Sequence, residues 1–186
     1  MTHRLIYVCL LVAALAGTSA AQAPQQPGMT LTSPAFADGA EFPQRFTQHD
    51  PAHPLSPKLD WTNVPEGTIS FVLILHDLEV AQNKTLEDSL HWIVFNIPGS
   101  VRGLPEGVPR EAKLADGTIQ PMNPRGHYGY RGPGAQVPPR HHYTFELYAL
   151  DTTLALGTDA TRAQVLQAVN GHVLGKAILM GLYHKK

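Results

Sequence analysis

Apolar and polar residues along the chain form short runs with the period of β-strands. Residues 69–76 are an almost unbroken apolar run that ends at Asp77, which is typical of a central, fully buried strand. Residues 90–97 form a second apolar run, which Pro98-Gly99 terminates. Residues 143–151 alternate, and this period of two predicts a third strand with one buried face. Shorter apolar stretches predict further strands at residues 29–32 and 177–183, and residues 59–61 begin the packed part of the domain, with Trp61 expected in the core.

One segment near the C-terminus has the spacing of a helix instead. Residues 160–170 carry Val165, Leu166 and Val169 on one side, with Asp159 as the expected N-cap. Gly171 or Gly175 would end this helix. We therefore expect a mostly β fold with a few peripheral helices, including this one.

The segments between the expected strands are long and rich in turn-forming residues. Residues 33–57 contain many Pro, Asp and His and predict a loop with room for an edge strand, and residues 79–88 predict a loop or a short helical turn. Residues 101–127 hold many Gly and Pro and no sustained period, so we expect a long surface excursion.

The first residues have the composition of a signal peptide. Arg4 is followed by an apolar stretch at residues 5–15, which is too short to span a bilayer, and then by small residues. We expect cleavage near Ala20 or Ala21, which places the protein in the periplasm or outside the cell. The predicted organisation is a signal peptide at residues 1–21, a Pro/Gln linker at 22–28 and one domain at 29–186, with no transmembrane segment in the mature chain.

Composition and charge exclude several classes of protein. With 43% hydrophobic and 16% charged residues, the chain has the composition of a globular protein and not of a disordered one. A formal net charge of −1 gives no basic patch for nucleic acid. The one cysteine, Cys9, lies in the apolar stretch of the signal peptide, so disulfides and thiolate metal sites are not expected.

Four polar side chains at strand ends are candidates for a binding site. Asp77 ends the central strand, where it is either a turn residue or a pocket carboxylate. His91 stands at the start of the next strand, and is either a satisfied core histidine or a donor to an anionic oxygen. His141 and Tyr143 are two apart in an extended segment and share a face, as a cross-strand aromatic pair or as two donors for a phosphate or carboxylate.

The loop before His141 adds a backbone element. Gly132-Pro133, followed by Pro138-Pro139, predicts a rigid loop in which a glycine lets backbone N–H groups approach a ligand. Ten histidines raise the question of a metal, but the chain lacks a His-Glu-x-x-His motif, and we expect no metal site. The nucleophile elbow and the phosphate-loop and dinucleotide fingerprints are absent too, so no cofactor is expected.

The order and spacing of five segments together resemble the phosphatidylethanolamine-binding protein family, in its bacterial branch of Raf-kinase-inhibitor-like proteins. The resemblance covers residues 31–184 and rests on residues 56–61, the run up to Asp77, residues 91–98, residues 129–133 and residues 141–150. It implies a β-sandwich with peripheral helices and a small anion pocket at one end. The pocket positions carried over are Asp77, His91, Gly132, Pro133, His141 and Tyr143.

The sequence departs from the family pattern after the central strand. The family reads Asp-Pro-Asp-Ala-Pro there, and this chain has Asp77-Leu78-Glu79-Val80-Ala81, so the first acid is kept and both prolines are replaced. We expect a less rigid loop at this position. Residues 134–137 are also inserted before Pro138-Pro139, which predicts a reshaped pocket rim.

The resulting hypothesis is an exported, non-catalytic protein that binds a small anion or a phosphate-type head group. Two alternatives stay open. The first is a protease or kinase inhibitor-like interaction protein that uses residues 101–127, and the second is a metal-assisted hydrolase that uses the histidines. If His91 and His141 donate as cations, affinity for an anion should fall as pH rises through their pKa values.

Overall fold

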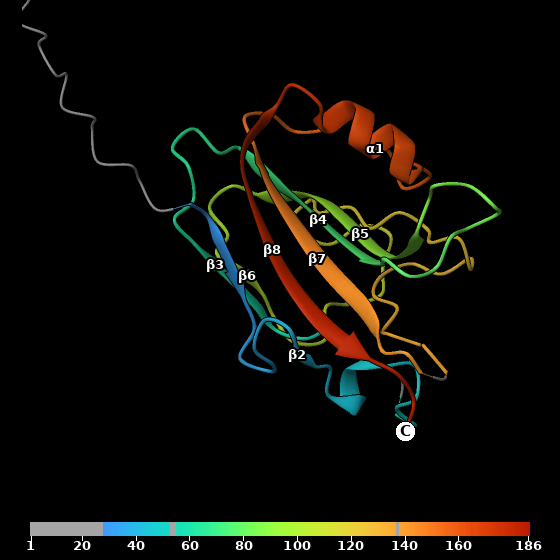
Figure 1. Cartoon of the computed structure of the whole chain (residues 1–186). Helices are drawn as coiled ribbons and strands as arrows, with labels where there is room; N and C mark the ends of the chain where they lie inside the picture. The colour runs from blue at the N-terminus through green and yellow to red at the C-terminus, as the bar shows by residue number, and fades with distance from the viewer. Residues whose placement is uncertain (1–27, 53–54, 137) are drawn as a thin grey trace, which may run out of the picture.

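The structure is a computed structural model in which residues 28–52, 55–136 and 138–186 are described (Figure 1). The expected signal peptide, its cleavage site near Ala20 or Ala21, and all of the linker except Gly28 lie outside these residues. Within them, no helix is both long and apolar enough to span a membrane.

Five strands form the larger sheet, in the order β2-β8-β7-β4-β5. Its centre is β4 (Ser70–Asp77), which pairs antiparallel with β5 (Ser89–Pro98) on one side and β7 (His141–Leu150) on the other. All eight residues of β4 are buried, as its continuous apolar run predicts. The outer strands are β8 (Val173–Tyr183), which is four residues longer at its start than expected, and β2 (Ala40–Glu41), which adds a short parallel edge.

Three short strands form a second sheet, in the order β1-β3-β6. They are β1 (Thr30–Thr32), β3 (Leu59–Thr62) and β6 (Gly103–Leu104), and they lie across one face of the larger sheet (Figure 1). The main core fills the space between the sheets, with Trp61, Phe71, Trp92 and Phe145 among its largest buried side chains. The expected β-sandwich is therefore confirmed.

The other face of the larger sheet is covered by the one α-helix in the described residues, α1 (Arg162–Val169), seen above the sheet in Figure 1. Val165 and Val169 pack on Val72 and Ile74 of β4 in a second core. The predicted helix is confirmed, but its N-cap is Thr161 and not Asp159, because Thr161 and Gln164 form a capping box. A single 3-10 turn, η1 (Gln44–Phe46), lies in the long segment after β2.

The expectation that residues 101–127 form a surface excursion is only partly right. The segment contains β6, and Ile119 pairs with Phe95 of β5 through two backbone hydrogen bonds of 2.9 Å. The buried Gln120 amide donates to the carbonyls of Pro109 and Glu111 and accepts from the Trp92 indole N–H at 2.8 Å. The hydrogen bonds of the Gln120 side chain thus hold this segment in place of the regular backbone hydrogen bonds of a strand. Such an arrangement leaves no periodic pattern in the sequence.

Candidate functional site

The candidate site lies at one end of the larger sheet, where β4 ends and β7 begins (Figure 1). Asp77, the last residue of β4, stands directly opposite Tyr143 of β7. His141 lies two residues before Tyr143 and therefore on the same face, with the two rings stacked at 6.3 Å. This face is the one that packs on the smaller sheet, because Leu75 and Phe145 beside the site belong to the main core.

His91 reaches the same face through a β-bulge. The register between β4 and β5 shifts, so that Leu90 pairs with His76, Trp92 pairs with Leu75, and His91 has no partner of its own. The bulge places two consecutive side chains on one face, with Trp92 in the main core and the His91 ring edge-on to Tyr143 at 5.1 Å.

The hydrogen bonds of His91 determine its tautomer. Its Nδ1 lies 3.0 Å from the carbonyl oxygens of both Arg131 and Gly132, which can only accept, so Nδ1 carries the proton. Burial lowers the pKa of His91 to about 3, and the positive charge of Arg131 acts in the same direction. Of the two possibilities that the sequence leaves open for His91, this environment favours the neutral ring, with the lone pair on Nε2.

Asp77 and His141 form a hydrogen-bonded pair at the rim of the site. Asp77 is almost fully buried, and its Oδ2 accepts from His141 Nδ1 at 2.8 Å. Its Oδ1 accepts from the backbone N–H of Glu79 at 3.1 Å, which closes the turn after β4. Asp77 is thus both the turn residue and the pocket carboxylate that the sequence left as alternatives.

Tyr143 connects the strand to the loop that follows Arg131. Its hydroxyl oxygen accepts from the backbone N–H groups of Gly134 at 3.1 Å and Ala135 at 3.0 Å. Burial raises the pKa of the Tyr143 phenol, so the hydroxyl keeps its proton. With two donors already bound to its oxygen, this hydroxyl is oriented as a proton donor.

The Gly132-Pro133 segment is held in place by a residue that the sequence did not single out. Gln48 donates from Nε2 to the Gly132 carbonyl at 2.7 Å, and its backbone N–H donates to the Pro133 carbonyl at 2.8 Å. A Cβ atom on Gly132 would lie 2.2 Å from the Phe46 carbonyl oxygen, so no other residue fits there. Gln48 lies in a loop of mixed polar composition, and no sequence pattern marks it.

Glu79, the second acid after β4, is a further member of the site that the sequence marks only by its distance from Asp77. It accepts from the backbone N–H of His142 at 2.7 Å and from the His142 ring. Burial opposes ionisation of Glu79, but the hydrogen bonds from His142 outweigh it and lower its pKa. Oxygen or nitrogen atoms of Asp77, Glu79 and His141 all lie within 4.8 Å of one another, which is close enough to hold a cation.

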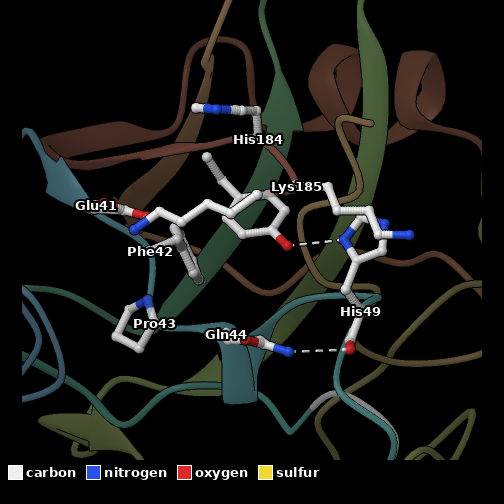
Figure 2. Close-up of a pocket in the computed structure, with 9 residues that line it drawn as sticks. Glu41, Phe42, Pro43, Gln44, His49, His184 and Lys185 are labelled. Carbon is white, nitrogen blue, oxygen red and sulfur yellow. Dashed lines mark hydrogen bonds and ion pairs between the residues drawn. The ribbon is translucent and has the colours of Figure 1, made fainter. Parts of the chain in front are cut away.

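A cavity of about 420 Å³ lies near the loop that carries Gly132 (Figure 2). His49 and Tyr183 meet in it through a hydrogen bond of 2.8 Å, and Gln44 donates to the His49 carbonyl. Gln136 bonds the other ring nitrogen of His49 at 2.9 Å, and Ala135 accepts from the Lys185 N–H. The loop at residues 132–136 thus contacts both this cavity and Tyr143.

The structure brings together all six residues that the sequence predicted. Asp77, His91, His141 and Tyr143 contribute side chains to one face, and Gly132 and Pro133 contribute the backbone beside them. Chemically, the site combines a phenol donor, a neutral imidazole acceptor, an imidazole held by a carboxylate, and a second carboxylate at the rim.

Comparison with known proteins gives consistent matches over nearly the whole domain. The family model described as phosphatidylethanolamine-binding protein matches residues 32–184. A UPF0098 protein of Methanothermobacter thermautotrophicus is 43% identical over 159 residues, which cover 84% of this chain and 99% of that protein. The UPF0098 protein YbcL of Escherichia coli is 34% identical over 138 residues, with 70% and 72% of the two chains covered.

Solved structures with this fold match as well. The crystal structure of a phosphatidylethanolamine-binding protein homolog, CT736 of Chlamydia trachomatis, has a TM-score of 0.73 at 34% identity, covering 86% of this chain and 99% of that one. E. coli YbcL has a TM-score of 0.75 at 28% identity, with 86% and 100% covered. The sequence and the fold agree, and this chain belongs to the phosphatidylethanolamine-binding protein family.

Proposed function

We propose that this family member is an exported protein that binds a small phosphate-type anion or head group non-covalently and does not catalyse a reaction on it. The observation that carries the proposal is the Tyr143 hydroxyl. Because its oxygen already accepts from Gly134 and Ala135, the hydroxyl can act only as a donor, and its proton is shared between the nearby Asp77 carboxylate and an oxygen of the ligand.

The neighbouring groups select which anion fits. Because Nε2 of the neutral His91 ring carries a lone pair and no proton, it cannot donate to a fully deprotonated oxygen. It accepts a hydrogen bond instead, from a P–OH group or an ammonium group of the ligand. The Gly132 N–H makes no hydrogen bond to another described residue, so it is a second donor for the ligand. His141 donates through Nε2 when its ring is cationic, since Nδ1 is held by Asp77.

The two carboxylates favour a ligand that also carries a positive charge. Asp77 is buried beside the donors, and Glu79 stands at the rim, where an ammonium group would meet it. Phosphoethanolamine with a singly protonated phosphate offers a partner to each of these groups, with a phosphate oxygen on Tyr143, its P–OH on His91 Nε2 and its ammonium toward the acids. The description of the Chlamydia trachomatis protein CT736 as a phosphatidylethanolamine-binding protein homolog is consistent with this ligand class.

Calorimetric titration of the purified protein with phosphoethanolamine and with inorganic phosphate tests the proposal. We expect Tyr143→Phe to weaken phosphoethanolamine binding about tenfold, because one charge-assisted hydrogen bond contributes about 1.5 kcal/mol. Tyr148→Phe is the matched control, since Tyr148 lies on the same strand and its hydroxyl donates to Glu146 on the opposite face.

Two results would contradict the proposal. One is equal affinity in the wild type and in Tyr143→Phe, which would place the ligand elsewhere. The other is release of phosphate from phosphoethanolamine, which would show turnover and favour a hydrolase. Expression of the full chain in a bacterium, with N-terminal sequencing of the secreted or periplasmic product, tests export, and a mature end at Ala21 or Gln22 is expected.

A further inference from the structure

A second cavity, of about 510 Å³, lies between the start of β5, residues 121–125 and the first turn of α1. Ile93 lines it and belongs to the core beneath α1, whereas Asp77 and Tyr143 lie on the face of the larger sheet that packs on the smaller one. Nothing in the proposed head-group function uses this cavity.

The cavity contains the guanidinium group of Arg131, which forms no direct ion pair with a described residue, although the more distant Asp77 carboxylate acts on its charge. Arg131 donates from Nη2 to Ser89 Oγ and to the Leu90 carbonyl, both at 3.1 Å, and no carboxylate among the described residues pairs with it. Its buried Nε has no hydrogen-bond partner, and burial lowers the pKa of this arginine. A partly buried charge that lacks a counter-ion is costly, and a bound anion would relieve that cost.

Asn123 adds a second unpaired donor on the same wall. Its side chain is 6% exposed, and its Oδ1 accepts from the backbone N–H groups of Arg125 at 2.9 Å and His127 at 3.3 Å. These bonds fix the orientation of the amide, so Nδ2 is the donor, and Nδ2 has no partner. The side chain of Arg125 also lines the cavity, and no ion pair joins it to another described residue.

The other residues that line the cavity favour a ligand with a single negatively charged group at one end and an apolar remainder. Leu90, Ile93, Pro121 and Met122 give the cavity an apolar wall, and Met122 is half exposed with no core to pack in. Asp88 is neutralised by Arg162 and His76, but Glu87 and Asp159 are exposed acids that would repel a second negative group.

We propose that this cavity is a separate binding site for an amphipathic monoanion, in which a carboxylate or phosphate-ester oxygen meets Arg131, Asn123 and Arg125 and an apolar body covers Leu90 and Met122. The site is distinct from the head-group site, but Arg131 links the two, because its carbonyl holds His91 and its charge interacts with His91 and Asp77. Its volume is in the range of sites for small organic ligands.

Titration of the ¹⁵N-labelled protein with octanoate, followed by amide chemical shifts, tests this inference. We expect amide shifts to concentrate at Leu90, Met122, Asn123 and Arg125, and binding at least tenfold weaker for octanol than for octanoate. Arg131→Met should weaken octanoate binding at least tenfold, and Arg140→Met, which changes an exposed arginine away from the cavity, should leave it unchanged. Because Arg131 also anchors β5, the exposed Arg125→Gln is an independent second variant, expected to weaken binding about threefold.

Three results would overturn the inference. The first is no change in the shifts of the cavity residues at millimolar octanoate. The second is equal binding of octanol and octanoate, which would remove the role of the arginines. The third is loss of octanoate binding in Tyr143→Phe or on addition of phosphoethanolamine, which would place the ligand in the head-group pocket. Octyl phosphate as a second probe shows whether the site prefers phosphate or carboxylate.

Discussion

The last two residues of β4, His76 and Asp77, point to opposite faces of the larger sheet, and each is part of a histidine–carboxylate pair. Asp77 faces the smaller sheet and accepts from His141, while His76 faces α1 and bonds to Asp88. The first pair stands beside a phenol and a neutral imidazole that still have a proton and a lone pair to offer. In the second pair, the carboxylate also binds Arg162, and His76 Nε2 lies 3.7 Å from Glu146.

The difference indicates what separates a binding site from a structural ion network. Both clusters place a histidine and a carboxylate at the end of the same strand, so residue type alone does not distinguish them. On the α1 face, Asp88 pairs with Arg162 and His76 while His76 Nε2 and Arg162 Nε lack hydrogen-bond partners among the described residues, and removing the Asp88 charge should mainly affect folding. On the sandwich face, the donors and acceptors are oriented but unsatisfied, and removing one should mainly affect binding.

The largest expected effect is on stability, at Asp88. Burial opposes ionisation of Asp88, but Arg162 and His76 outweigh it and lower its pKa. Asp88→Asn removes the shared counter-charge of both groups, and we expect a loss of about 2 kcal/mol in the free energy of unfolding at pH 7. Urea unfolding measures this loss, and phosphoethanolamine affinity should not change.

Asp151→Asn is the matched control for this variant. Asp151 also bonds a histidine, His172, at 2.7 Å, but both side chains are about half exposed. An exposed pair contributes less than about 0.5 kcal/mol. Equal losses of stability in the two variants would show that the Asp88 cluster is not a structural ion network. A loss of head-group binding in Asp88→Asn would show that this cluster takes part in the binding site.

The next effect concerns pH and His91. With its pKa at about 3 in the folded protein, His91 stays neutral where the unfolded chain, with a pKa near 6.5, takes up a proton. The free energy of unfolding should therefore fall with acidification below pH 6.5, by about 1.4 kcal/mol per pH unit from this group. His91→Gln, which can still donate to the two carbonyls, should remove that part of the slope between pH 6 and 4.

Urea unfolding at pH 4.5, 5.5 and 7 for both proteins measures the slope. His172→Gln is the comparison variant, because it removes a histidine that is about half exposed and lies away from the site. Parallel curves for wild type and His91→Gln would mean that His91 titrates normally, and the assignment of a neutral acceptor in the site would then be wrong.

The strands and the membership of the site were predictable because they leave periodic or positional signals. The apolar run of β4, the alternation of β7 and the two-residue spacing of His141 and Tyr143 each report directly on which face a side chain takes. The charge state of His91 was not predictable in this way. It depends on two carbonyls about 40 residues away and on a bulge that the apolar run of β5 does not reveal.

The N-cap of α1 and the order within residues 101–127 were missed for a related reason. Asp159 and Thr161 are both good N-caps, and only the reciprocal bond of Gln164 decides between them. Gln120 holds its segment through carbonyls nine and eleven residues away, where the sequence shows only a polar residue among turns. Signals of this kind lie in pairs of residues, and a reading of single positions does not find them.

The smallest expected effect is that of a Glu79 variant, which distinguishes recognition of the ammonium group from recognition of the phosphate group of phosphoethanolamine. Glu79 stands at the rim of the site, partly exposed, so its interaction with an ammonium group is screened by water. We expect Glu79→Gln to weaken phosphoethanolamine binding about threefold and to leave inorganic phosphate binding unchanged or slightly stronger. His142→Ala is the control, because it removes the partner of Glu79 and keeps the carboxylate. Calorimetry shows weaker binding of phosphoethanolamine alone if the acids bind an ammonium group, whereas equal weakening of both ligands would mean that Glu79 only shapes the turn after β4.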